Sequence, residues 1–286
     1  MPNNNSPKVS ICVPVYGVEK YIEKCARSLF EQTYSNIEFL FVDDCSPDNS
    51  ITLLERIIED YPSRKACVRI IHHEHNRGLA GSRNTAVAAA TGDFIAHVDS
   101  DDWLELNAIE LLVNKQIETG ADIVSGTIVS HFEDGTSTLI EPNYPNKDAM
   151  LREIVQLSLY HTLCKRIIRT SLYKGNEIFA MEGVNLGEDH YTLPRLVYFS
   201  KSFAKIDDVV YNYNRNVETS FVHDSLYNFK FKNYSDTLTA LQILYDFFAE
   251  HDTCLLPILQ KIRLSYVFKT IHEPSVKKSQ YLPDIR

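Results

Sequence analysis

The sequence lacks the long apolar runs of a membrane protein. No stretch approaches the ~18 consecutive apolar residues of a membrane-spanning helix, although 44% of the 286 residues are hydrophobic. The polar start M-P-N-N-N-S also lacks the basic and apolar regions of a signal peptide. We therefore expect a cytoplasmic protein without a spanning segment, for which a peripheral contact at the inner face of the cell membrane stays open.

Positive charge and paired cysteines are also scarce. The formal net charge is −9, which argues against a general nucleic-acid binder because affinity for a phosphate backbone needs clustered lysine and arginine. The six cysteines show no C-x-x-C spacing, and several lie in apolar segments where they resemble small core residues. This pattern fits a reducing cytoplasm.

The first hundred residues contain a regular alternation of strands and helices. Apolar residues recur at every second position in the strand candidates and at helical spacing between them. The expected strands are 8–15, 37–42, 68–71 and 93–98, and the expected helices are 18–32, a segment that begins at Ser46-Pro47, and 79–90. This order, with short connections, indicates an α/β fold in which helices flank a Rossmann-like, mostly parallel sheet.

Beyond Trp103 the pattern is less regular. We expect a hairpin through Asp134-Gly135 and, at the carboxyl end, a helical appendage followed by a polar, poorly ordered tail from Glu273. The expected helices are 106–113, 148–163, 187–199, 227–248 and 255–268, and the expected strands are 121–129 and 204–213. This pattern predicts a main domain over residues 1–220 and a C-terminal helical segment over 221–286.

Carboxylates are concentrated at the end of segment Thr91–Trp103, which reads T-G-D-F-I-A-H-V-D-S-D-D-W. Carboxylates as close as Asp99, Asp101 and Asp102 raise one another's pKa unless a cation neutralises them. Oxygen ligands favour Mg²⁺ or Mn²⁺, and Mg²⁺ is usually held by one or two carboxylates together with substrate phosphates. Asp99 and Asp101 are therefore a candidate metal pair. The alternative is a solvated acidic loop in which Asp102 caps the next helix.

A second acidic pair, Asp43-Asp44, follows the expected strand 37–42. Ligands of parallel α/β sheets bind beyond the carboxyl ends of the strands, where a carboxylate can accept hydrogen bonds from a nucleobase imide or a ribose hydroxyl. The residues that follow this pair also favour turn and cap chemistry, which is the alternative.

Five segments together resemble a known enzyme family. They are the strand 7–16, V-D-D-C-S-P-D-N-S, N-R-G-L-A-G-S-R-N, T-G-D-F-I-A-H-V-D-S-D-D-W and L-G-E-D-H-Y, and they span residues 7–191. In this order they are similar to the motifs of family 2 glycosyltransferases, which have the GT-A fold. The resemblance implies that residues 1–220 bind a nucleotide-sugar and catalyse the inverting transfer of one sugar to a hydroxyl. The implied acceptor is a saccharide or a lipid-linked saccharide, as in cell-surface polysaccharide assembly. Processive synthases of similar fold carry membrane spans and a Q-x-x-R-W segment, and this sequence has neither.

The resemblance also implies roles for individual residues. Tyr16 and Asp44 are expected against the base, with Pro14 and Ser100 also at the donor, and Arg83 is expected to hold the donor. Asp101, helped by Asp99, is expected to hold Mn²⁺ or Mg²⁺ on the diphosphate. If Asp44 accepts a hydrogen bond from a uracil N3–H, the donor is a UDP-linked hexose or N-acetylhexosamine.

A neutral sugar hydroxyl must lose its proton as it attacks, so a positioned carboxylate is required as general base. Glu188-Asp189 is the candidate pair. These residues also begin an expected helix, where acidic side chains stabilise the helix dipole, and the residues alone leave this alternative open. In the family pattern the second acid, here Asp189, is the base.

Several basic and histidine residues are weaker candidates. Lys165 and Arg215 resemble basic positions of the family that face the diphosphate or an anionic acceptor, and the alternative is that each is a surface charge. His223 is expected as a third protein ligand of the metal, as in related GT-A enzymes. The cluster of His72, His73 and His75 ends a strand, where neighbouring side chains point to opposite faces, so we interpret these histidines as polar strand-end residues.

Two other functions compete with sugar transfer. A nucleotidyltransferase needs a basic, glycine-rich phosphate loop after the first strand, but this chain has Y-G-V-E-K there. A non-catalytic nucleotide-sugar sensor would keep Asp44 and the D-S-D sequence but would not need Asp189. Specificity for the sugar is expected to depend on Trp103 and on loops at 125–131 and 181–185.

Overall fold

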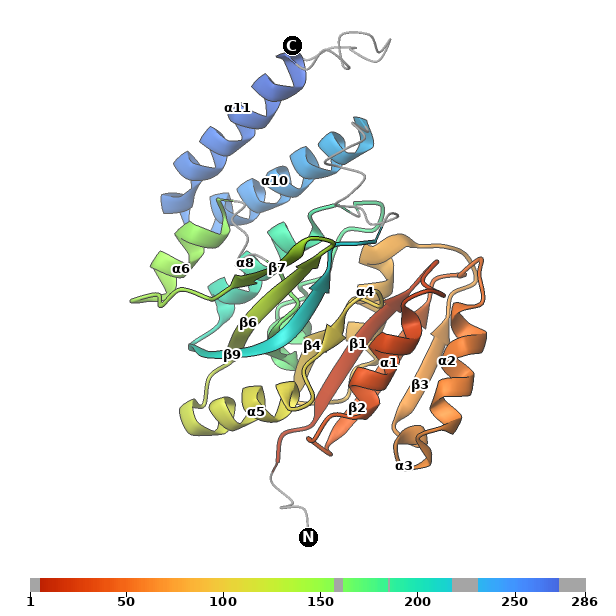
Figure 1. The fold of residues 1–286 in the computed structure, drawn as a ribbon. Helices are drawn as coiled ribbons and strands as arrows, with labels where there is room; N and C mark the ends of the chain where they lie inside the picture. The colour runs from red at the N-terminus through yellow and green to blue at the C-terminus, as the bar shows by residue number, and fades with distance from the viewer. Residues whose placement is uncertain (1–5, 157–161, 185, 218–230, 273–286) are drawn as a thin grey trace.

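The structure is a computed structural model that describes residues 6–156, 162–184, 186–217 and 231–272. Its strands form one sheet in the order β3-β2-β1-β4-β8-β6-β9-β5, with β7 paired to β6 (Figure 1). The strands are β1 (Val9–Val15), β2 (Ile37–Asp43), β3 (Val68–His72), β4 (Phe94–His97), β5 (Trp103–Leu104), β6 (Ile123–Phe132), β7 (Gly135–Leu139), β8 (Arg166–Arg169) and β9 (Phe203–Asn214). Strands β1 to β4 run parallel, as do β6 and β9, whereas β5, β7 and β8 are antiparallel to their neighbours. The predicted mostly parallel α/β sheet is confirmed.

Helices cover both faces of this sheet. They are α1 (Ile22–Phe30), α2 (Ser50–Glu59), α3 (Pro62–Lys65), α4 (Gly78–Ala89), α5 (Ala108–Thr119), α6 (Lys147–Ile154), α7 (Thr170–Gly175), α8 (Glu188–Phe199), α10 (Phe231–His251) and α11 (Leu256–His272). Alternate residues of β1 point to opposite faces, so Ile11 and Val13 share a core with α1, α2 and α5, while Cys12 belongs to the other core.

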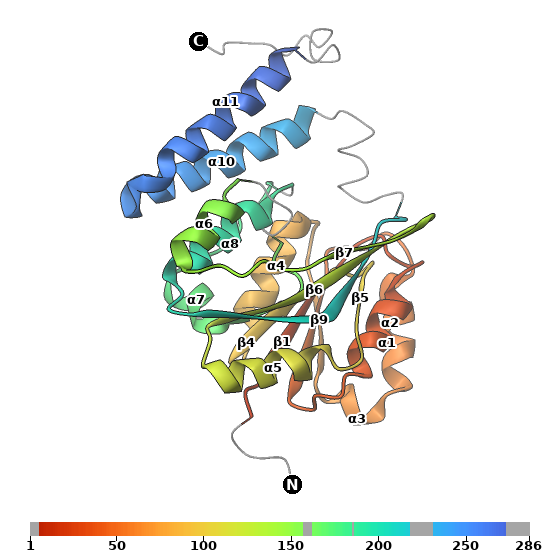
Figure 2. The same ribbon diagram turned by 60° about the vertical axis from the view of Figure 1, so that its left-hand side comes forward.

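The second core lies under α4, α6, α7 and α8 and continues into the C-terminal helices. Leu244 and Phe248 of α10 belong to the same buried cluster as Leu196 of α8, and α11 lies against α10 (Figure 2). The predicted C-terminal helices are confirmed. The boundary expected near residue 220 and the tail from Glu273 lie outside the described residues.

The bounds of several expected helices differ in the structure. The helix expected over 148–163 spans Lys147–Ile154, and residues 157–161 lie outside the described part of the chain. The helix expected to begin at Ser46-Pro47 begins instead at Ser50, because Asp48 accepts hydrogen bonds from the Ser46 hydroxyl at 2.7 Å and from the Ser50 hydroxyl at 2.5 Å. These contacts hold residues 46–49 in a turn ahead of the helix.

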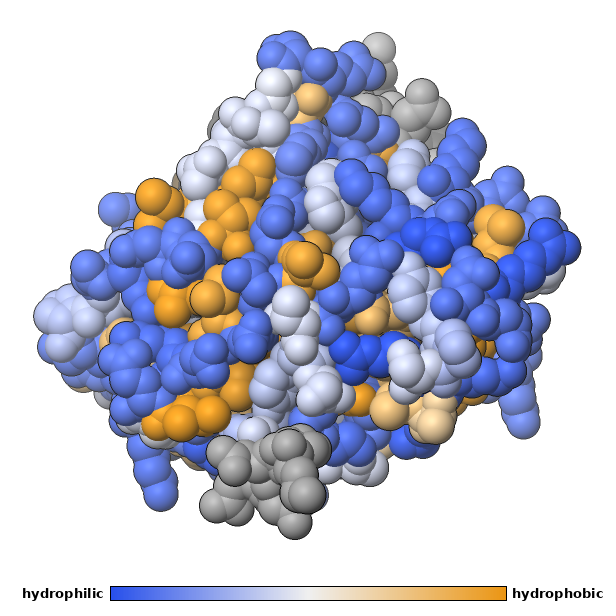
Figure 3. All heavy atoms as spheres, turned by 60° about the horizontal axis from the view of Figure 1, so that its bottom comes forward, coloured by the Kyte–Doolittle hydropathy of each residue, from blue (hydrophilic) through white to orange (hydrophobic). Residues whose placement is uncertain are grey.

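The described helices include none that is long and apolar enough to cross a membrane. In the view of Figure 3, hydrophilic residues cover most of the visible face and apolar residues form separate patches.

A buried carboxylate ties the start of β2 to the turn before β4. Glu38 is 6% exposed and accepts hydrogen bonds from the Ser10 hydroxyl at 2.5 Å and the Thr91 backbone N–H at 2.6 Å. It also pairs with the Lys8 ammonium at 3.1 Å. Burial alone would raise the pKa of Glu38, but these hydrogen bonds outweigh it and lower the pKa from 4.5 to about 2.

We expect Glu38→Gln to destabilise the fold by about 2–3 kcal/mol at pH 7, measured by urea unfolding. Because the pKa of Glu38 is lower in the folded state, its contribution is complete above pH 4.5 and is lost as the pH falls toward 2. The difference between wild type and variant should therefore shrink at low pH. Glu59→Gln, which removes a 66% exposed partner of Lys65, is the control and should cost less than ~1 kcal/mol. Equal unfolding midpoints for wild type and Glu38→Gln at pH 7 would refute this assignment.

Candidate active site

The carboxyl ends of β1, β2 and β4 bring the predicted residues to one edge of the sheet. These strands are parallel neighbours, and Val15 pairs in register with Asp43 while Cys12 pairs with His97. Tyr16 and Asp44 follow β1 and β2 directly, and Asp99 is two residues beyond β4, so their backbones share this edge. Tyr16 is 53% exposed and Pro14 is half-buried, which leaves the tyrosine ring open to a ligand.

The D-S-D-D loop, residues 99–102, is held from several sides. Asp99 Oδ1 accepts from Arg83 Nη2 at 2.8 Å, and Asp99 Oδ2 lies 3.5 Å from the Cys164 thiol. Burial raises the pKa of Cys164 well above its ordinary value, so the thiol stays protonated and donates. Ser100 is also buried.

Asp102 does not cap the next helix. It is 1% exposed, and its oxygens accept from the Tyr211 hydroxyl at 2.6 Å and from the Asn214 backbone N–H at 2.8 Å. Asn107 occupies the N-cap of α5 instead. The cap interpretation of Asp102 is therefore wrong, because β9 supplies its hydrogen-bond donors.

Asp101 differs from its neighbours because its carboxylate has no hydrogen-bond or ion-pair partner among the described side chains. Burial, and then the charge of Asp99, raise the pKa of Asp101 to about 7. A divalent cation would relieve this repulsion, so the donor set fits Mg²⁺ or Mn²⁺. Within the described residues no group of three or more histidine, cysteine or acidic side chains is arranged to hold a metal. Further ligands would have to come from a bound diphosphate or from residues such as His223, which lies outside the described part.

Arg83 joins the D-S-D-D loop to the start of α8. Its guanidinium is 4% exposed and contacts Asp99, Glu188 and Asp189. One cation therefore serves three carboxylates, and the cluster keeps an excess of negative charge. Arg83, which was predicted to hold the donor, thus contacts the acidic residues and fixes their positions.

Glu188 and Asp189 begin α8 after Gly187, whose φ of 84° is in the left-handed region that favours glycine. Burial raises the pKa of Glu188 to about 8 despite its contact with Arg83. Asp189 is more accessible, with 17% of its side chain exposed against 7% for Glu188, and its Oδ2 accepts from the Leu163 backbone N–H at 3.2 Å. Both acids therefore lie in the first helical turn, and Asp189 is the more exposed of the two.

Asp44 organises the start of α4. It is 3% exposed and accepts from the backbone N–H groups of Arg77 at 2.7 Å and Gly78 at 2.8 Å. A third contact, at 2.7 Å, is to His73 Nδ1. A carboxylate offers about four acceptor sites, so one remains for a ligand. His72 pairs separately with Asp43 at 2.8 Å.

The weaker candidates lie in different settings. The Lys165 ammonium is fully buried, 2.6 Å from Glu141, and Arg166 donates to the same carboxylate at 3.0 Å. The surface-charge interpretation of Lys165 is therefore wrong. The Arg215 guanidinium lies over the Tyr213 ring, 4.4 Å from its centroid, and is half-buried. The predicted specificity segment 125–131 belongs to β6, where the His131 ring lies 4.6 Å from the Trp103 ring, centroid to centroid, at an angle of 41°.

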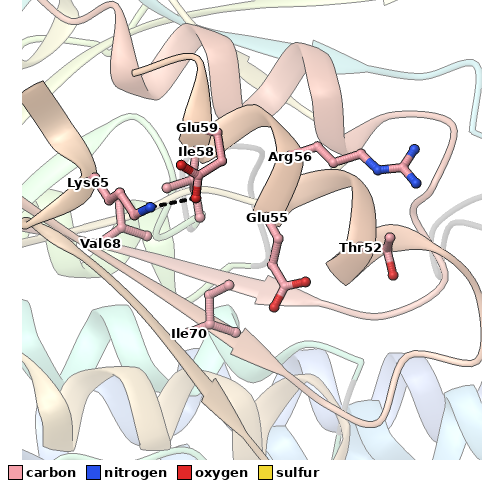
Figure 4. Close-up of a pocket in the computed structure, with 8 residues that line it drawn as sticks. All are labelled: Thr52, Glu55, Arg56, Ile58, Glu59, Lys65, Val68 and Ile70. Atoms are coloured by element: carbon pink, nitrogen blue, oxygen red, sulfur yellow. Dashed lines mark hydrogen bonds and ion pairs between the residues drawn. The ribbon is translucent and has the colours of Figure 1, made fainter. Parts of the chain in front are cut away.

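A surface hollow of about 590 Å³ lies elsewhere, between α2 and the edge strand β3 (Figure 4). Its walls include Glu55, Ile70 and the exposed ion pair Lys65–Glu59 at 2.6 Å. None of its lining residues belongs to the acidic site.

Comparison with known proteins identifies the family. The family model for glycosyl transferase family 2 matches residues 10–175. The glycosyltransferase EpsJ of Bacillus subtilis is 31% identical over 218 residues, which cover 73% of this chain and 62% of EpsJ. GlyG of Streptococcus pneumoniae is 29% identical over 222 residues, which cover 73% of this chain and 71% of GlyG. The chain therefore matches somewhat less than two thirds of EpsJ.

Solved structures agree on the fold. S. aureus TarS 1–349 in complex with UDP-GlcNAc has a TM-score of 0.65 at 21% identity, over 91% of this chain and 80% of that chain. The mannosyltransferase PcManGT from Pyrobaculum calidifontis, in complex with GDP-Man and Mn²⁺, has a TM-score of 0.62 at 16% identity, over 94% of this chain and 75% of that one. With the family model covering more than half of its length, the chain belongs to the family 2 glycosyltransferases and has the GT-A fold.

Proposed function

We propose that this protein transfers one sugar from a nucleotide diphosphate donor, with UDP as the preferred nucleotide, to a hydroxyl of a saccharide or lipid-linked saccharide. The main support is that Arg83 bridges Asp99 of the D-S-D-D loop and Asp189 of α8, which brings the loop and the start of that helix together. Asp101, beside Asp99, has no partner among the described side chains, and Asp189 is the accessible acid on the other side. A cation site and a proton acceptor are the two groups that this reaction needs.

The donor would lie along the sheet edge. Tyr16 offers an exposed ring for the base, Asp44 retains an acceptor site for an imide N–H, and Pro14 and Ser100 line the path between them. Asp101 and Asp99 would hold Mn²⁺ or Mg²⁺, with His223 as a further ligand. The solved relatives support this arrangement, since TarS binds UDP-GlcNAc and PcManGT binds GDP-Man with Mn²⁺.

The chemistry follows from these positions. An acceptor oxygen attacks the anomeric carbon, the bond from that carbon to the β-phosphate oxygen breaks, and the configuration inverts. Asp189 takes the hydroxyl proton as the new bond forms. A divalent cation, when bound, stabilises the charge of the departing nucleoside diphosphate. Arg83 keeps Asp189 and Asp99 at a fixed separation.

The acceptor and the location of the protein extend this proposal. Transfer of a hexose or an N-acetylhexosamine to a growing cell-surface polysaccharide fits a family member of this kind. We place the protein in the cytoplasm, with a peripheral membrane contact if the acceptor carries a lipid. The six cysteines, which all lie in the described part, are free thiols, as expected in a reducing compartment.

The competing functions predict different products. A glycosyltransferase slowly hydrolyses its donor to a nucleoside diphosphate and free sugar when no acceptor is present. A nucleotidyltransferase supplied with pyrophosphate transfers the nucleotidyl group to it, so that a nucleoside triphosphate forms and the sugar 1-phosphate is released. A nucleotide-sugar sensor binds the donor without turnover.

A thermal-shift screen of nucleoside diphosphates with Mn²⁺ tests the donor site. UDP at about 100 times its Kd should add ~2.7 kcal/mol of stability, and GDP should add less. Asp44→Asn should remove the preference for UDP, because one carboxylate oxygen becomes an amide that cannot accept from N3–H. Asp43→Asn changes the neighbouring carboxylate and should keep the preference. Equal stabilisation of the wild type by UDP and GDP, or an unchanged preference in Asp44→Asn, would exclude this base assignment.

A further inference from the structure

We propose that the hydroxyl of Tyr211 positions the D-S-D-D loop for its cation, an inference that rests on the proposed function. Tyr211 lies on β9 and is 1% exposed. Its hydroxyl accepts from the Asp99 backbone N–H at 3.1 Å and donates to Asp102 Oδ2 at 2.6 Å. A single oxygen from the far half of the sheet therefore bridges the first and last residues of the loop.

The rest of the loop is fixed around this bridge. The Asp102 backbone N–H donates to the Asp99 carbonyl at 3.1 Å and closes the turn. The second oxygen of Asp102 accepts from the Asn214 backbone N–H at 2.8 Å. Asp99 is held by Arg83 Nη2 at 2.8 Å. Asp99 and Asp102 therefore accept from other elements of the fold, whereas the described side chains give Asp101 no donor.

This division of roles determines which carboxylate can meet a cation. Asp102 uses both oxygens within the protein, and one oxygen of Asp99 is bound to Arg83. Asp101 sits between them with its oxygens uncommitted among the described side chains. If the Tyr211 hydroxyl is removed, Asp102 loses one of its two donors and its carboxylate becomes a competitor for the cation. The backbone of Asp99 also loses its acceptor, so the ligand pair is no longer preorganised.

Strand pairing makes Tyr211 suited to this role. Trp103 and Leu104 of β5 pair antiparallel with Asn212 and Tyr211 of β9, so the residues that follow the loop are anchored to the same strand. The hydroxyl thus couples the nucleotide-binding half of the sheet to the β6–β9 half.

The test compares UDP affinity with and without Mn²⁺ by isothermal titration calorimetry, for wild type and Tyr211→Phe. We expect Tyr211→Phe to weaken Mn²⁺-dependent UDP binding by about tenfold or more, which is the value of a hydrogen bond to a charged group. Metal-free UDP affinity should not change, because Tyr211 acts only through the metal ligands. Tyr34→Phe removes a partly buried hydroxyl that does not contact the loop and donates to the Pro7 carbonyl at 2.5 Å. This control should leave both affinities unchanged.

A double-mutant cycle with Asp102→Asn identifies the path of the effect. If Tyr211 acts through Asp102, the double variant should bind Mn²⁺–UDP no more weakly than the weaker single variant. A Tyr211→Phe protein with wild-type Mn²⁺ enhancement, or strictly additive losses in the cycle, would overturn the inference. Failure of the proposed function looks different, because the wild type itself would then show no Mn²⁺-dependent UDP binding.

Discussion

Replacement of Asp101 by asparagine is expected to abolish sugar transfer while leaving the fold intact. Asparagine keeps the shape of the side chain but removes the charge that a divalent cation requires. The Asp101 carboxylate has no partner among the described side chains and accepts a hydrogen bond from its own backbone N–H, which the asparagine oxygen can keep. The melting temperature should therefore stay within a few degrees of wild type, and UDP affinity in Mn²⁺ should fall to the metal-free value.

Asp93, another aspartate next to β4, provides a matched control for Asp101. Asp93, at the opposite end of β4, accepts from the Lys8 backbone N–H at 2.8 Å, and Asp93→Asn should retain full activity. Removal of the metal with EDTA should reproduce the Asp101→Asn phenotype in the wild type, and added Mn²⁺ should restore only the wild type. Full activity after EDTA treatment would show that the metal assignment is wrong.

Asp189→Asn is expected to slow the chemical step by 10²–10⁴-fold, or ~3–5 kcal/mol in barrier. The reason is that an amide cannot take the proton from the hydroxyl of the acceptor sugar. The amide oxygen can still accept from Arg83, but the amide NH2 cannot accept from the Leu163 backbone N–H, so a small loss of stability is also expected. Donor affinity should hardly change. The readouts are kcat from donor turnover, UDP affinity and melting temperature.

The neighbouring acid is the internal control for Asp189. Glu188 is less exposed and also contacts Arg83, so Glu188→Gln should affect stability more than catalysis and should be the milder of the two in kcat. If Asp189 only stabilised the start of α8, its replacement would cost ~0.3–1 kcal/mol of stability with normal turnover. A wild-type kcat in Asp189→Asn would defeat the proposed mechanism.

The parallel half of the sheet was predictable because its signals are local. Each of β1, β2 and β4 is a run of buried residues that ends in a turn or a charged residue, and the alternation with helices defines the topology. The helix from Glu188 was also predictable despite Pro194, because its apolar spacing continues on both sides of the proline. Because Asp44 and Asp99 lie at the carboxyl ends of these strands, the sequence also predicted that they share one edge of the sheet.

The strand β8 could not be predicted in this way. It has four residues and inserts antiparallel between β4 and β6, which come from distant parts of the sequence. A run as short as R-I-I-R gives no periodicity of its own. This insertion also explains why Lys165 is buried, because the residue leads into a central strand and pairs with Glu141.

The contacts that organise the site could not be predicted from the sequence either. Tyr211 and Cys164 touch the D-S-D-D loop across 112 and 65 positions of sequence, and nothing in their own neighbourhoods indicates this. Arg83 could be assigned to the site from its motif, but its contact with three carboxylates depends on where α8 begins. Residue types and spacing thus predicted the chemistry, while the positioning contacts required the fold.

The most direct test of metal-dependent sugar transfer is ³¹P NMR of the protein incubated with a panel of UDP-hexoses and UDP-N-acetylhexosamines, with Mn²⁺ and without acceptor. We expect one donor to be slowly converted to UDP and free sugar. This conversion should stop with EDTA and in the Asp101→Asn protein, and it should slow strongly in Asp189→Asn. Formation of a sugar 1-phosphate, or an unchanged spectrum for every donor that binds, would contradict the proposed sugar transfer.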